Sequence, residues 1–585
     1  MDKIKPQIEQ VQKNEILLKD HSSWLHFGNP YRLIVAESLK DVVPTLREIE
    51  KLVQVNGWHA AGFLSYEAAH AFDPAMHTRL TSGFPFLWFG LYPQPRSVQL
   101  PDPERAKDVF DWHPTIERED YNSAIAKIKD YIAHGQTYQV NYTMRLKADF
   151  KGSAWNFFLH LAQIQNNHAA YMDIGRYAIC SASPELFFQL DGNTITCRPM
   201  KGTASRGLIT AEDRVQSQWL QNSEKNRAEN VMIVDMIRND LGQIAEIGSV
   251  RVLQLFDTER YPTLWQMTST VTARTNASFI DILTALFPSA SITGAPKVST
   301  MNIIAGLEST ARKIYTGTIG YFSPGRKAKF NVAIRTALID REQHQAEYGV
   351  GGGIVWDSTS TDEYEEAVLK AGVLIAPHHV FSLLETLLWT PKEGFFLYEK
   401  HIERMLDSAD YFDIPITKQK LENYLEHIFF EFRTPQRVRV LLNQCGELRS
   451  ESHPFELAEN TQTLKTSLAR GPVDSRNVFL FHKTTLRDVY EAARIGLENF
   501  DDVLLYNEWD ELTEFTIGNL VVELEGQLIT PPISCGVLAG TFRAHLLETG
   551  QIVERTIPIQ LLSSCTRMYR INSIRRWQEV DITGS

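Results

Sequence analysis

The sequence is poor in the features that mark secreted, zinc-binding or nucleic-acid-binding proteins. Its 585 residues include only five cysteines, which are scattered and form no Cys-X-X-Cys pair. This pattern indicates a reducing compartment and no structural zinc site. The net charge is −12, and no block of lysines and arginines stands out. We therefore expect no binding to nucleic acid, although local cations can still hold a small anion.

No segment of the sequence has the composition expected of a membrane span. The first 20 residues, MDKIKPQIEQVQKNEILLKD, lack the apolar core of a secretory signal peptide. The most apolar long window, residues 368–389, is interrupted by Lys370, Pro377 and Glu385 and by two histidines. We therefore expect a cytoplasmic protein that makes no contact with a membrane.

The length of the chain exceeds what a single core can fill, so two to four domains are expected. Strand-like runs such as TITCRPM and FNVAIRTALI occur among helical patterns such as AENVMIVDMIRNDLG. This mixture predicts an α/β (α+β) protein. The character of the motifs changes shortly after residue 375, which predicts one domain over 1–375 and another over 380–585.

Two helices that carry carboxylates are predicted, one over 223–242 and one that begins near Ser360. On the first helix Glu229 lies near an apolar face. Positions i, i+3 and i+7 of the second helix share one side and hold Glu363, Glu366 and Lys370. Such groups are more often surface charges. Carboxylates are also ligands for Mg²⁺, and spacing alone does not show that two distant helices meet.

The stretch RPMKGTASRG, residues 198–207, places Lys201 between a strand end and a small flexible turn. A loop lysine is usually a solvated charge. It can also clamp a phosphate or, when desolvated, act as an amine nucleophile. The glycine-rich run GVGGG, residues 349–353, does not fit the Gly-X-Gly-X-X-Gly pattern, which argues against dinucleotide binding.

A series of motifs decides among these alternatives because all of them occur in one order. They are GQTYQVNYT, SASPELFF, RPMKGTASRG, EKNRAENVMIVDMIRNDLG, FPSASITGAPKVSTMNIIAGLE, YTGTIGYF, NVAIRT and GVGGGIVWDSTSTDEYEEAVLKA. Most of residues 15–372 thereby resembles chorismate-utilising enzymes of the anthranilate synthase component I and aminodeoxychorismate synthase component I family. The resemblance implies antiparallel sheets and helices around a central active site, and metal-dependent removal of the chorismate 4-hydroxyl.

The resemblance also implies roles for individual residues. Glu229 and Glu366 match the family's Mg²⁺ ligands, with Glu363 acting through water, and Glu185 matches the general acid for the leaving hydroxyl. Arg335 and Lys370 match the partners of the substrate carboxylates. The implied substrate-binding set is Gln139, Thr203, Arg335, Gly351, Gly352, Gly353 and Lys370.

Lys201 distinguishes two branches of this family. Anthranilate synthases carry alanine at its position, whereas aminodeoxychorismate synthases carry lysine. The resemblance implies that Lys201 attacks C2 of chorismate as the 4-hydroxyl leaves, before ammonia adds at C4. Isochorismate and salicylate synthases have a lysine base where this chain has Gln139, which disfavours the addition of water. Asn226 and Gln266 depart from the family pattern, in which a glutamate and a histidine are common.

The second half carries a different set of motifs, which includes GFFLYEKHIERMLDSADYFDIP, FLFHKTTLRDVYEAAR, LLYNEWDELTEFTIGNLVV and TPPISCGVLAGTFR. Residues 381–585 thereby resemble fold-type IV pyridoxal-phosphate enzymes, which include branched-chain and D-amino-acid aminotransferases and aminodeoxychorismate lyase. The resemblance implies two α/β subdomains with pyridoxal 5'-phosphate between them. It matches Lys483 to the lysine that binds the cofactor covalently and Glu514 to the partner of its ring nitrogen. Contacts to the remainder of the cofactor are implied for Arg404, Asn519 and Thr541.

The two resemblances together imply a bifunctional synthesis of p-aminobenzoate for folate, in which chorismate is aminated to 4-amino-4-deoxychorismate and pyruvate is then eliminated. An alternative is an anthranilate synthase component I fused to an aminotransferase, which Lys201 opposes. A non-catalytic binding protein is a third hypothesis, and the intact candidate residues speak against it. No Gly-X-Cys-X-Gly-X-Gln signature of a glutaminase occurs, so ammonia is expected from a separate glutamine amidotransferase subunit. A homodimer through the second half is a candidate assembly.

Overall fold

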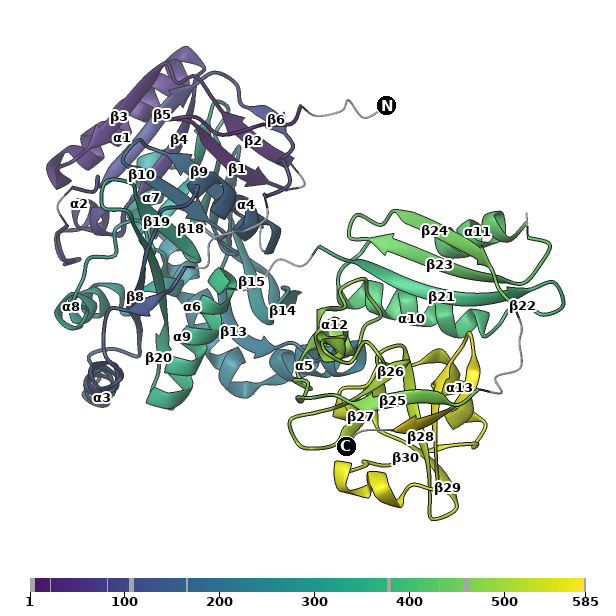
Figure 1. The fold of residues 1–585 in the computed structure, drawn as a ribbon. Helices are drawn as coiled ribbons and strands as arrows, with labels where there is room; N and C mark the ends of the chain where they lie inside the picture. The colour runs from purple at the N-terminus through teal and green to yellow at the C-terminus, as the bar shows by residue number, and fades with distance from the viewer. Residues whose placement is uncertain are drawn as a thin grey trace. The chain divides into compact units, whose positions relative to one another are not determined.

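The computed structural model describes residues 6–21, 23–81, 83–104, 110–164, 167–375, 380–430, 432–456 and 462–582. The chain divides into two compact units. Figure 1 colours the chain by residue number, from purple at the N-terminus to yellow at the C-terminus. The first unit contains Met1–Ser205 and Ser217–His378, and the second contains Arg206–Gln216 and His379–Ser585. The boundary expected from the sequence near 375–380 falls largely on residues 376–379, which lie outside the described residues.

Two large sheets form the first unit, and their named strands pair antiparallel throughout. In order across the first sheet lie β16 (Gly294–Ala295), β8 (Gln139–Asp149), β20 (Gln345–Ile354), β19 (Thr336–Asp340), β10 (Tyr177–Ser181), β9 (Ala170–Asp173), β1 (Ile16–Asp20), β2 (Ser23–Phe27) and β6 (Arg96–Val98), with β7 (His113–Pro114) beside β8. Across the second sheet lie β13 (Met200–Ser205), β15 (Leu264–Arg274), β12 (Thr194–Arg198), β11 (Leu186–Asp191), β18 (Lys327–Val332), β17 (Thr318–Ser323), β4 (His59–Leu64), β5 (Leu87–Tyr92) and β3 (Arg32–Ala36), with β14 (Arg251–Arg260) beside β15.

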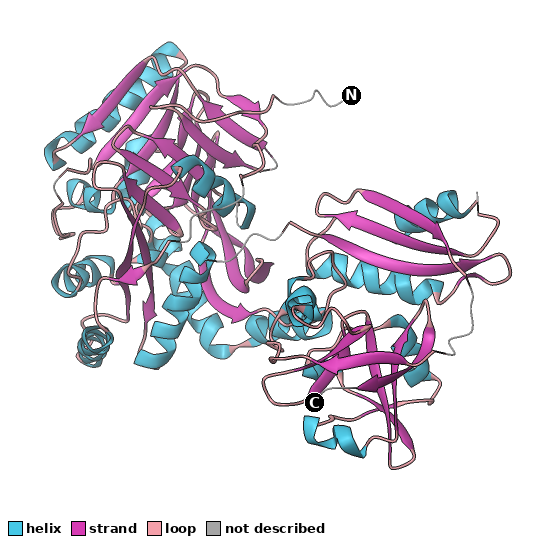
Figure 2. Ribbon diagram, viewed as in Figure 1, coloured by secondary structure: helices cyan, strands magenta, loops and turns pink. Residues whose placement is uncertain are grey.

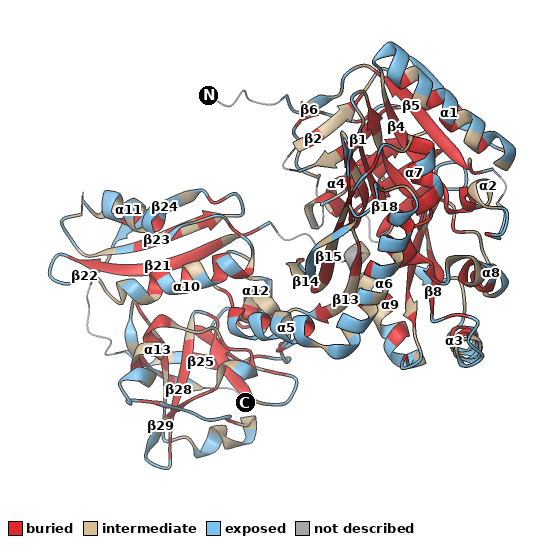
Figure 3. Cartoon of the chain, turned by 180° about the vertical axis from the view of Figure 1, so that it is seen from behind, coloured by how far each residue is buried: buried red, intermediate tan, exposed pale blue. Residues whose placement is uncertain are grey.

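The two sheets pack face to face through apolar side chains. Ile16 and Ile179 from the first sheet and Phe63 from the second are fully buried in one shared cluster. Figure 2 shows the strands in magenta, and Figure 3 shows how completely β4, β5 and β18 are buried. Burial on both faces explains why these strands are apolar along most of their length rather than alternating.

Helices cover the outer faces of both sheets. The helices of this unit are α1 (Leu39–Asn56), α2 (Ala69–Phe72), α3 (Arg118–Ala133), α4 (Ala154–Ile164), α6 (Glu224–Gly242), α7 (Phe279–Leu286), α8 (Lys297–Leu307) and α9 (Ser360–Ile375), and α5 (Thr210–Asn222) begins in the second unit. The apolar faces of α1, α6 and α7 pack against the second sheet, and those of α3, α4, α8 and α9 pack against the first. No helix in the described part of the chain combines the length and apolarity that crossing a membrane requires.

The two carboxylate helices form where the sequence predicts them. The hydroxyl of Ser223 caps α6 by accepting the Asn226 N–H at 3.4 Å. Helix α6 packs on β13, and α9 packs on β20. Lys201, which the sequence placed beside a flexible turn, lies within strand β13, because its neighbours pair with β15. The glycine run 349–353 likewise forms part of β20.

The second unit has two subdomains. The first is a four-stranded antiparallel sheet of β21 (Ser382–Thr390), β22 (Gly394–Phe395), β23 (Gln436–Asn443) and β24 (Leu448–Pro454), against which α10 (Tyr398–Tyr411) and α11 (Lys418–Phe429) pack. The second is an eight-stranded sheet of β27 (Leu512–Phe515), β26 (Asp502–Tyr506), β25 (Leu464–Leu468), β32 (Arg576–Ile582), β31 (Arg567–Asn572), β28 (Gly518–Leu524), β29 (Gln527–Thr530) and β30 (Val553–Glu554), accompanied by α12 (Asp488–Arg494) and α13 (Thr541–Glu548). An additional pairing of β27 with β28 closes a ring of strands. The two subdomains predicted for this half are thus present.

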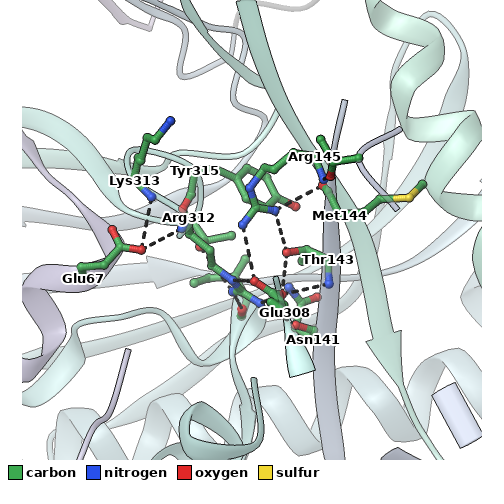
Figure 4. Close-up of polar contacts among 12 residues, drawn as sticks. Glu67, Asn141, Thr143, Met144, Arg145, Glu308, Arg312, Lys313 and Tyr315 are labelled. Atoms are coloured by element: carbon green, nitrogen blue, oxygen red, sulfur yellow. Dashed lines mark hydrogen bonds and ion pairs between the residues drawn. The ribbon is translucent and has the colours of Figure 1, made fainter. Parts of the chain in front are cut away.

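Figure 4 shows a cluster of charged residues in the first unit, among which Glu308, Arg312 and Arg145 are buried. The guanidinium of Arg312 donates to both carboxylate oxygens of Glu308, at 2.6 and 3.0 Å, and Arg145 approaches the same carboxylate at 3.4 Å. All three side chains are at most 4% exposed. Burial alone would raise the pKa of Glu308, but Arg312 and Arg145 outweigh it and lower that pKa below its ordinary value. Glu308 is therefore ionised between two cations.

We expect Glu308→Ala to destabilise the protein by about 3–5 kcal/mol, because it leaves two buried guanidinium groups without their shared anion. The matched control is Asp235→Ala on α6. Asp235 forms an ion pair with Arg238, and both side chains are more than half exposed. Removal of that surface pair should lower the free energy of unfolding by less than about 1 kcal/mol. Urea unfolding followed by circular dichroism measures both, and equal losses would contradict the role given to Glu308.

Candidate active sites in the two units

A cavity of about 430 Å³ in the first unit brings together residues that are far apart in the sequence. The predicted residues that line it are Glu185, Lys201, Thr203, Glu229, Arg335, Gly351, Gly353, Glu363, Glu366 and Lys370. Lys201 lies on strand β13, Glu229 on helix α6 and Glu366 on helix α9. The carboxylates of the two helices therefore do face one shared space, which spacing alone did not show.

Gln139 and Gly352, which complete the predicted substrate-binding set, adjoin this cavity. A Cβ atom on Gly353 would lie 2.3 Å from Lys201 Nζ and 2.4 Å from Gln139 Nε2, so these two side-chain ends lie beside the same glycine. A Cβ atom on Gly352 would lie 2.8 Å from Glu363 Oε2. Glycine is needed at both positions because a side chain would displace the functional groups. Gln139 is fully buried, and neither of its amide atoms has a hydrogen-bond partner within the protein.

The pKa values of the three predicted metal ligands are shifted in different directions. Lys370 lies 2.7 Å from Glu366 and lowers the pKa of its carboxyl. Burial raises the pKa of Glu229 and of Glu363, and the charge of Glu366 raises both further. Glu363 is also held by the Ser358 hydroxyl at 2.6 Å. The described residues contain no group of three His, Cys, Asp or Glu side chains placed to enclose a metal by themselves.

Mg²⁺ still fits this cavity. It typically needs only one or two protein carboxylates, together with water and substrate oxygens. Mutual repulsion between Glu229, Glu363 and Glu366 is what a divalent cation would relieve. Glu229 and Glu366 would then be its direct ligands, and its chemistry would be to neutralise a carboxylate of the substrate.

Glu185 has the properties of a proton donor. It is 3% exposed, and its Oε1 accepts the Ser291 hydroxyl at 2.5 Å. Burial raises its pKa to about 7, although Ser291 and Lys201 act in the opposite direction. A carboxyl group with this pKa is protonated in a large fraction of molecules near neutral pH, as a general acid must be.

Two cations complete the cavity. The Lys370 ammonium donates to the Gly351 carbonyl at 3.0 Å and pairs with Glu366. Arg335 is 7% exposed, and burial lowers the pKa of its guanidinium. A buried arginine in this state would gain stability from an anionic ligand, since its attraction to the ligand would offset the cost of burial.

The buried cluster around Glu308 lies directly behind this cavity. Arg312 donates to the backbone carbonyls of Asn141 and Ile292, both of which line the cavity, at 2.7 and 3.0 Å. The Arg145 guanidinium lies over the ring of Tyr315, another lining residue. Sequence analysis did not identify these residues. Glu308 and Arg312 stand four apart, and such a pair cannot be told from a surface ion pair before the tertiary structure is known.

A second cavity, of about 650 Å³, lies in the second unit. Its lining includes all five residues predicted to contact a cofactor, namely Arg404, Lys483, Glu514, Asn519 and Thr541. Burial lowers the pKa of Lys483 to about 8, and the neighbouring Arg404 lowers it too. Burial raises the pKa of Glu514 to about 8. Glu514 accepts hydrogen bonds from the Tyr490 hydroxyl at 2.8 Å and the Asn519 amide at 2.9 Å.

The chemistry of this lining fits pyridoxal 5'-phosphate. An amine with a lowered pKa suits covalent attachment of an aldehyde, and a buried carboxyl suits a pyridine nitrogen. Thr541 is the first residue of α13 and lines the cavity together with Arg404, so the N–H groups at the start of that helix would suit an anion there. A Cβ atom on Gly540 would lie 1.9 Å from Asn519 Oδ1, which explains why glycine precedes this helix.

Comparisons with known proteins agree with this division. The model of chorismate binding enzymes matches residues 94–376, and that of amino-transferase class IV matches residues 382–582. Aminodeoxychorismate synthase component 1 of Klebsiella aerogenes is 41% identical over 267 residues, which are 45% of this chain and 59% of that relative. Anthranilate synthase component 1 of Aquifex aeolicus is 36% identical over 276 residues, which are 46% of this chain and 55% of that relative. The chain thus spans between 55% and 59% of the length of these two relatives.

A solved structure shows the same fold for the first half. The crystal structure of anthranilate synthase component I from Streptococcus pneumoniae has a TM-score of 0.52 at 24% identity, covering 63% of this chain and 93% of that one. The sequence-based expectation of a chorismate-utilising fold followed by a fold-type IV domain is confirmed. Residues 94–376 are therefore similar to chorismate binding enzymes, and residues 382–582 are similar to amino-transferase class IV.

Proposed function

We propose that the chain converts chorismate and ammonia to 4-amino-4-deoxychorismate in its first unit, and that compound to p-aminobenzoate and pyruvate in its second. The observation that carries the proposal is the position of Lys201. Its side chain lines the same cavity as Glu185, Glu229 and Glu366, beside Gly353 and Gln139. An amine at this place can act on a bound substrate, whereas a solvated surface lysine cannot.

In the first reaction, Arg335 and Lys370 would bind the substrate carboxylates. The amine of Lys201 would bond to C2 while the ring double bonds shift and the C4–O bond breaks. Glu185 would protonate the departing hydroxyl, which leaves as water. Ammonia would then bond to C4, and the reverse shift would release Lys201. Gln139 cannot act as a base, so water would not be activated at C2.

In the second reaction, Lys483 would remove the proton from C4 of the aminated intermediate, and its pKa of about 8 suits a base near neutral pH. Pyridoxal 5'-phosphate, when bound, supplies the electron sink for this step. Arg404 and Thr541 would hold the phosphate end, and Glu514 would hold the ring nitrogen. Loss of the enolpyruvyl group as pyruvate then makes the ring aromatic.

The proposal implies further components. Ammonia would come from a separate glutamine amidotransferase subunit, because the 585 residues contain no glutaminase signature. The cofactors would be Mg²⁺ in the first unit and pyridoxal 5'-phosphate in the second. A homodimer through the second unit and a cytoplasmic location remain part of the proposal. The product would serve folate synthesis.

Product identification tests the proposal directly. The purified full chain, given chorismate, MgCl₂, an ammonium salt and pyridoxal phosphate, should form p-aminobenzoate and pyruvate, which chromatography with mass detection resolves. Lys201→Ala should abolish p-aminobenzoate formation because the nucleophile is lost, whereas Lys327→Ala, at an exposed position of β18, should not. Lys483→Ala should accumulate 4-amino-4-deoxychorismate. Anthranilate as the product of the unaltered chain would overturn the proposal.

The pH dependence of the first reaction tests the role of Glu185. Since Glu185 must be protonated to donate, kcat/KM for 4-amino-4-deoxychorismate formation should fall as the pH rises above about 7. Glu185→Gln should reduce kcat/KM by roughly 10²–10⁴-fold and should remove that alkaline limb. The control is Glu342→Gln, whose side chain is 68% exposed. An unchanged alkaline limb in Glu185→Gln would assign the titration to another group.

A further inference from the structure

Two buried ionisable residues stand behind the phosphate end of the second cavity. Arg404 and Thr541 line the cavity, and behind them lie Glu385 on β21 and His401 on α10. The side chains of Glu385 and His401 are 4% and 1% exposed. One carboxylate oxygen of Glu385 lies 2.6 Å from His401 Nδ1, and His401 Nε2 lies 3.3 Å from the Thr541 hydroxyl oxygen. The four residues form a continuous chain of contacts that ends at the cavity.

Glu385 is ionised in this chain of contacts. Arg404 donates to both of its oxygens, from Nε at 2.8 Å and from Nη2 at 2.7 Å. Burial would raise the pKa of Glu385, but Arg404 and His401 outweigh it and lower that pKa to about 2. Arg404 also donates from Nη1 to the Ala539 carbonyl at 3.1 Å. Three of its five N–H groups are thereby used, and one on each terminal nitrogen remains for an anion in the cavity.

The ionised state of Glu385 fixes one proton of His401. At 2.6 Å from a carboxylate oxygen, Nδ1 must carry hydrogen, because two lone pairs would otherwise face each other. A neutral His401 therefore has no hydrogen on Nε2, which can only accept. The Thr541 hydroxyl then donates its single hydrogen to Nε2 and turns an oxygen lone pair toward the cavity.

Protonation of His401 reverses this last hydrogen bond. Nε2 then donates to the Thr541 oxygen, and the hydroxyl hydrogen becomes available to an acceptor in the cavity. A phosphate offers only acceptors at this point when it is a dianion. The same proton also changes the charge of the group, since Glu385 and Arg404 cancel each other and only a protonated His401 adds a positive charge behind the phosphate.

We propose that His401 is a positioning residue that couples binding of the cofactor phosphate to the uptake of a proton, which turns the Thr541 hydroxyl from His401 toward the phosphate. The inference rests on the proposed cofactor of the second unit and adds a residue that does not touch it. The charged groups that face His401 are Glu385 from β21, Arg404 from its own helix and Lys483 from the loop before α12. From helix α13, the Thr541 hydroxyl lies 3.3 Å from His401 Nε2.

Proton uptake on binding requires that His401 is neutral before the cofactor binds, and its surroundings favour that state. Burial lowers the pKa of His401, and the charges of Arg404 and Lys483 lower it too, although Glu385 acts in the opposite direction. At a pH above the ordinary pKa of histidine, His401 is therefore neutral when the cavity holds no anion. The charge of a phosphate beside Thr541 and Arg404 would move the balance toward the protonated form.

The test is proton uptake on binding, measured by titration calorimetry of the full chain without cofactor. Pyridoxal 5'-phosphate and, separately, inorganic phosphate are titrated at pH 8 in buffers of different ionisation enthalpy. Unaltered protein should take up more protons than His401→Gln, by up to about one per site. The control is His427→Gln, at an exposed position of α11, which should match the unaltered protein.

A second variant guards against failure of His401→Gln to fold. Thr541→Val keeps His401 but removes the hydroxyl that links it to the phosphate, so it should lower proton uptake as well. The affinity for pyridoxal 5'-phosphate should weaken with rising pH in unaltered protein more steeply than in either variant.

The outcomes separate the two proposals. Binding with the same proton uptake in unaltered protein and His401→Gln would overturn the inference and leave the proposed function in place. Absence of pyridoxal 5'-phosphate binding to the unaltered chain would overturn both. Reduced uptake in His401→Gln and Thr541→Val, with normal uptake in His427→Gln, would establish the coupling.

Discussion

The ion pair between Glu308 and Arg312 is the constraint on which the first active site depends. Two cations and a carboxylate in the core are stable only while each keeps its partners, because a buried charge that loses its partner cannot be rehydrated. Arg312 also donates to the carbonyls of Asn141 and Ile292, and both of these residues line the cavity. The wall of the cavity is thereby fixed by charge as well as by apolar packing.

The second unit uses the same arrangement. Arg404 faces the cavity, and Glu385 holds its guanidinium from behind through two hydrogen bonds. A long flexible side chain would otherwise lose conformational freedom on binding a phosphate. With Glu385 in place this ordering occurs on folding, so the guanidinium would already be ordered when an anion enters the cavity.

Four carboxyl groups in the first cavity illustrate how environment separates roles. Lys370 lowers the pKa of Glu366, whereas burial raises that of Glu185 to about 7 and also raises those of Glu229 and Glu363. Groups of one chemical type thus acquire different pKa values within one cavity, which suits them to different roles. The difference arises because Lys370 lies one turn from Glu366 on α9, whereas burial dominates at the other three carboxyl groups.

The sequence by itself determined the fold class of each half, and its motifs in a fixed order named ten residues that line the first cavity and five that line the second. It also indicated helix α6, whose cap at Ser223 is a local feature. It placed Lys201 between a strand end and a flexible turn, whereas the structure continues strand β13 to Ser205, since pairing with β15 is a long-range property. Only the tertiary structure decided that Glu229 and Glu366 share a cavity, that Glu308 and Arg312 are buried, and that His401 stands between Glu385 and Thr541. These facts depend on burial and on contacts between distant segments, which local patterns do not encode.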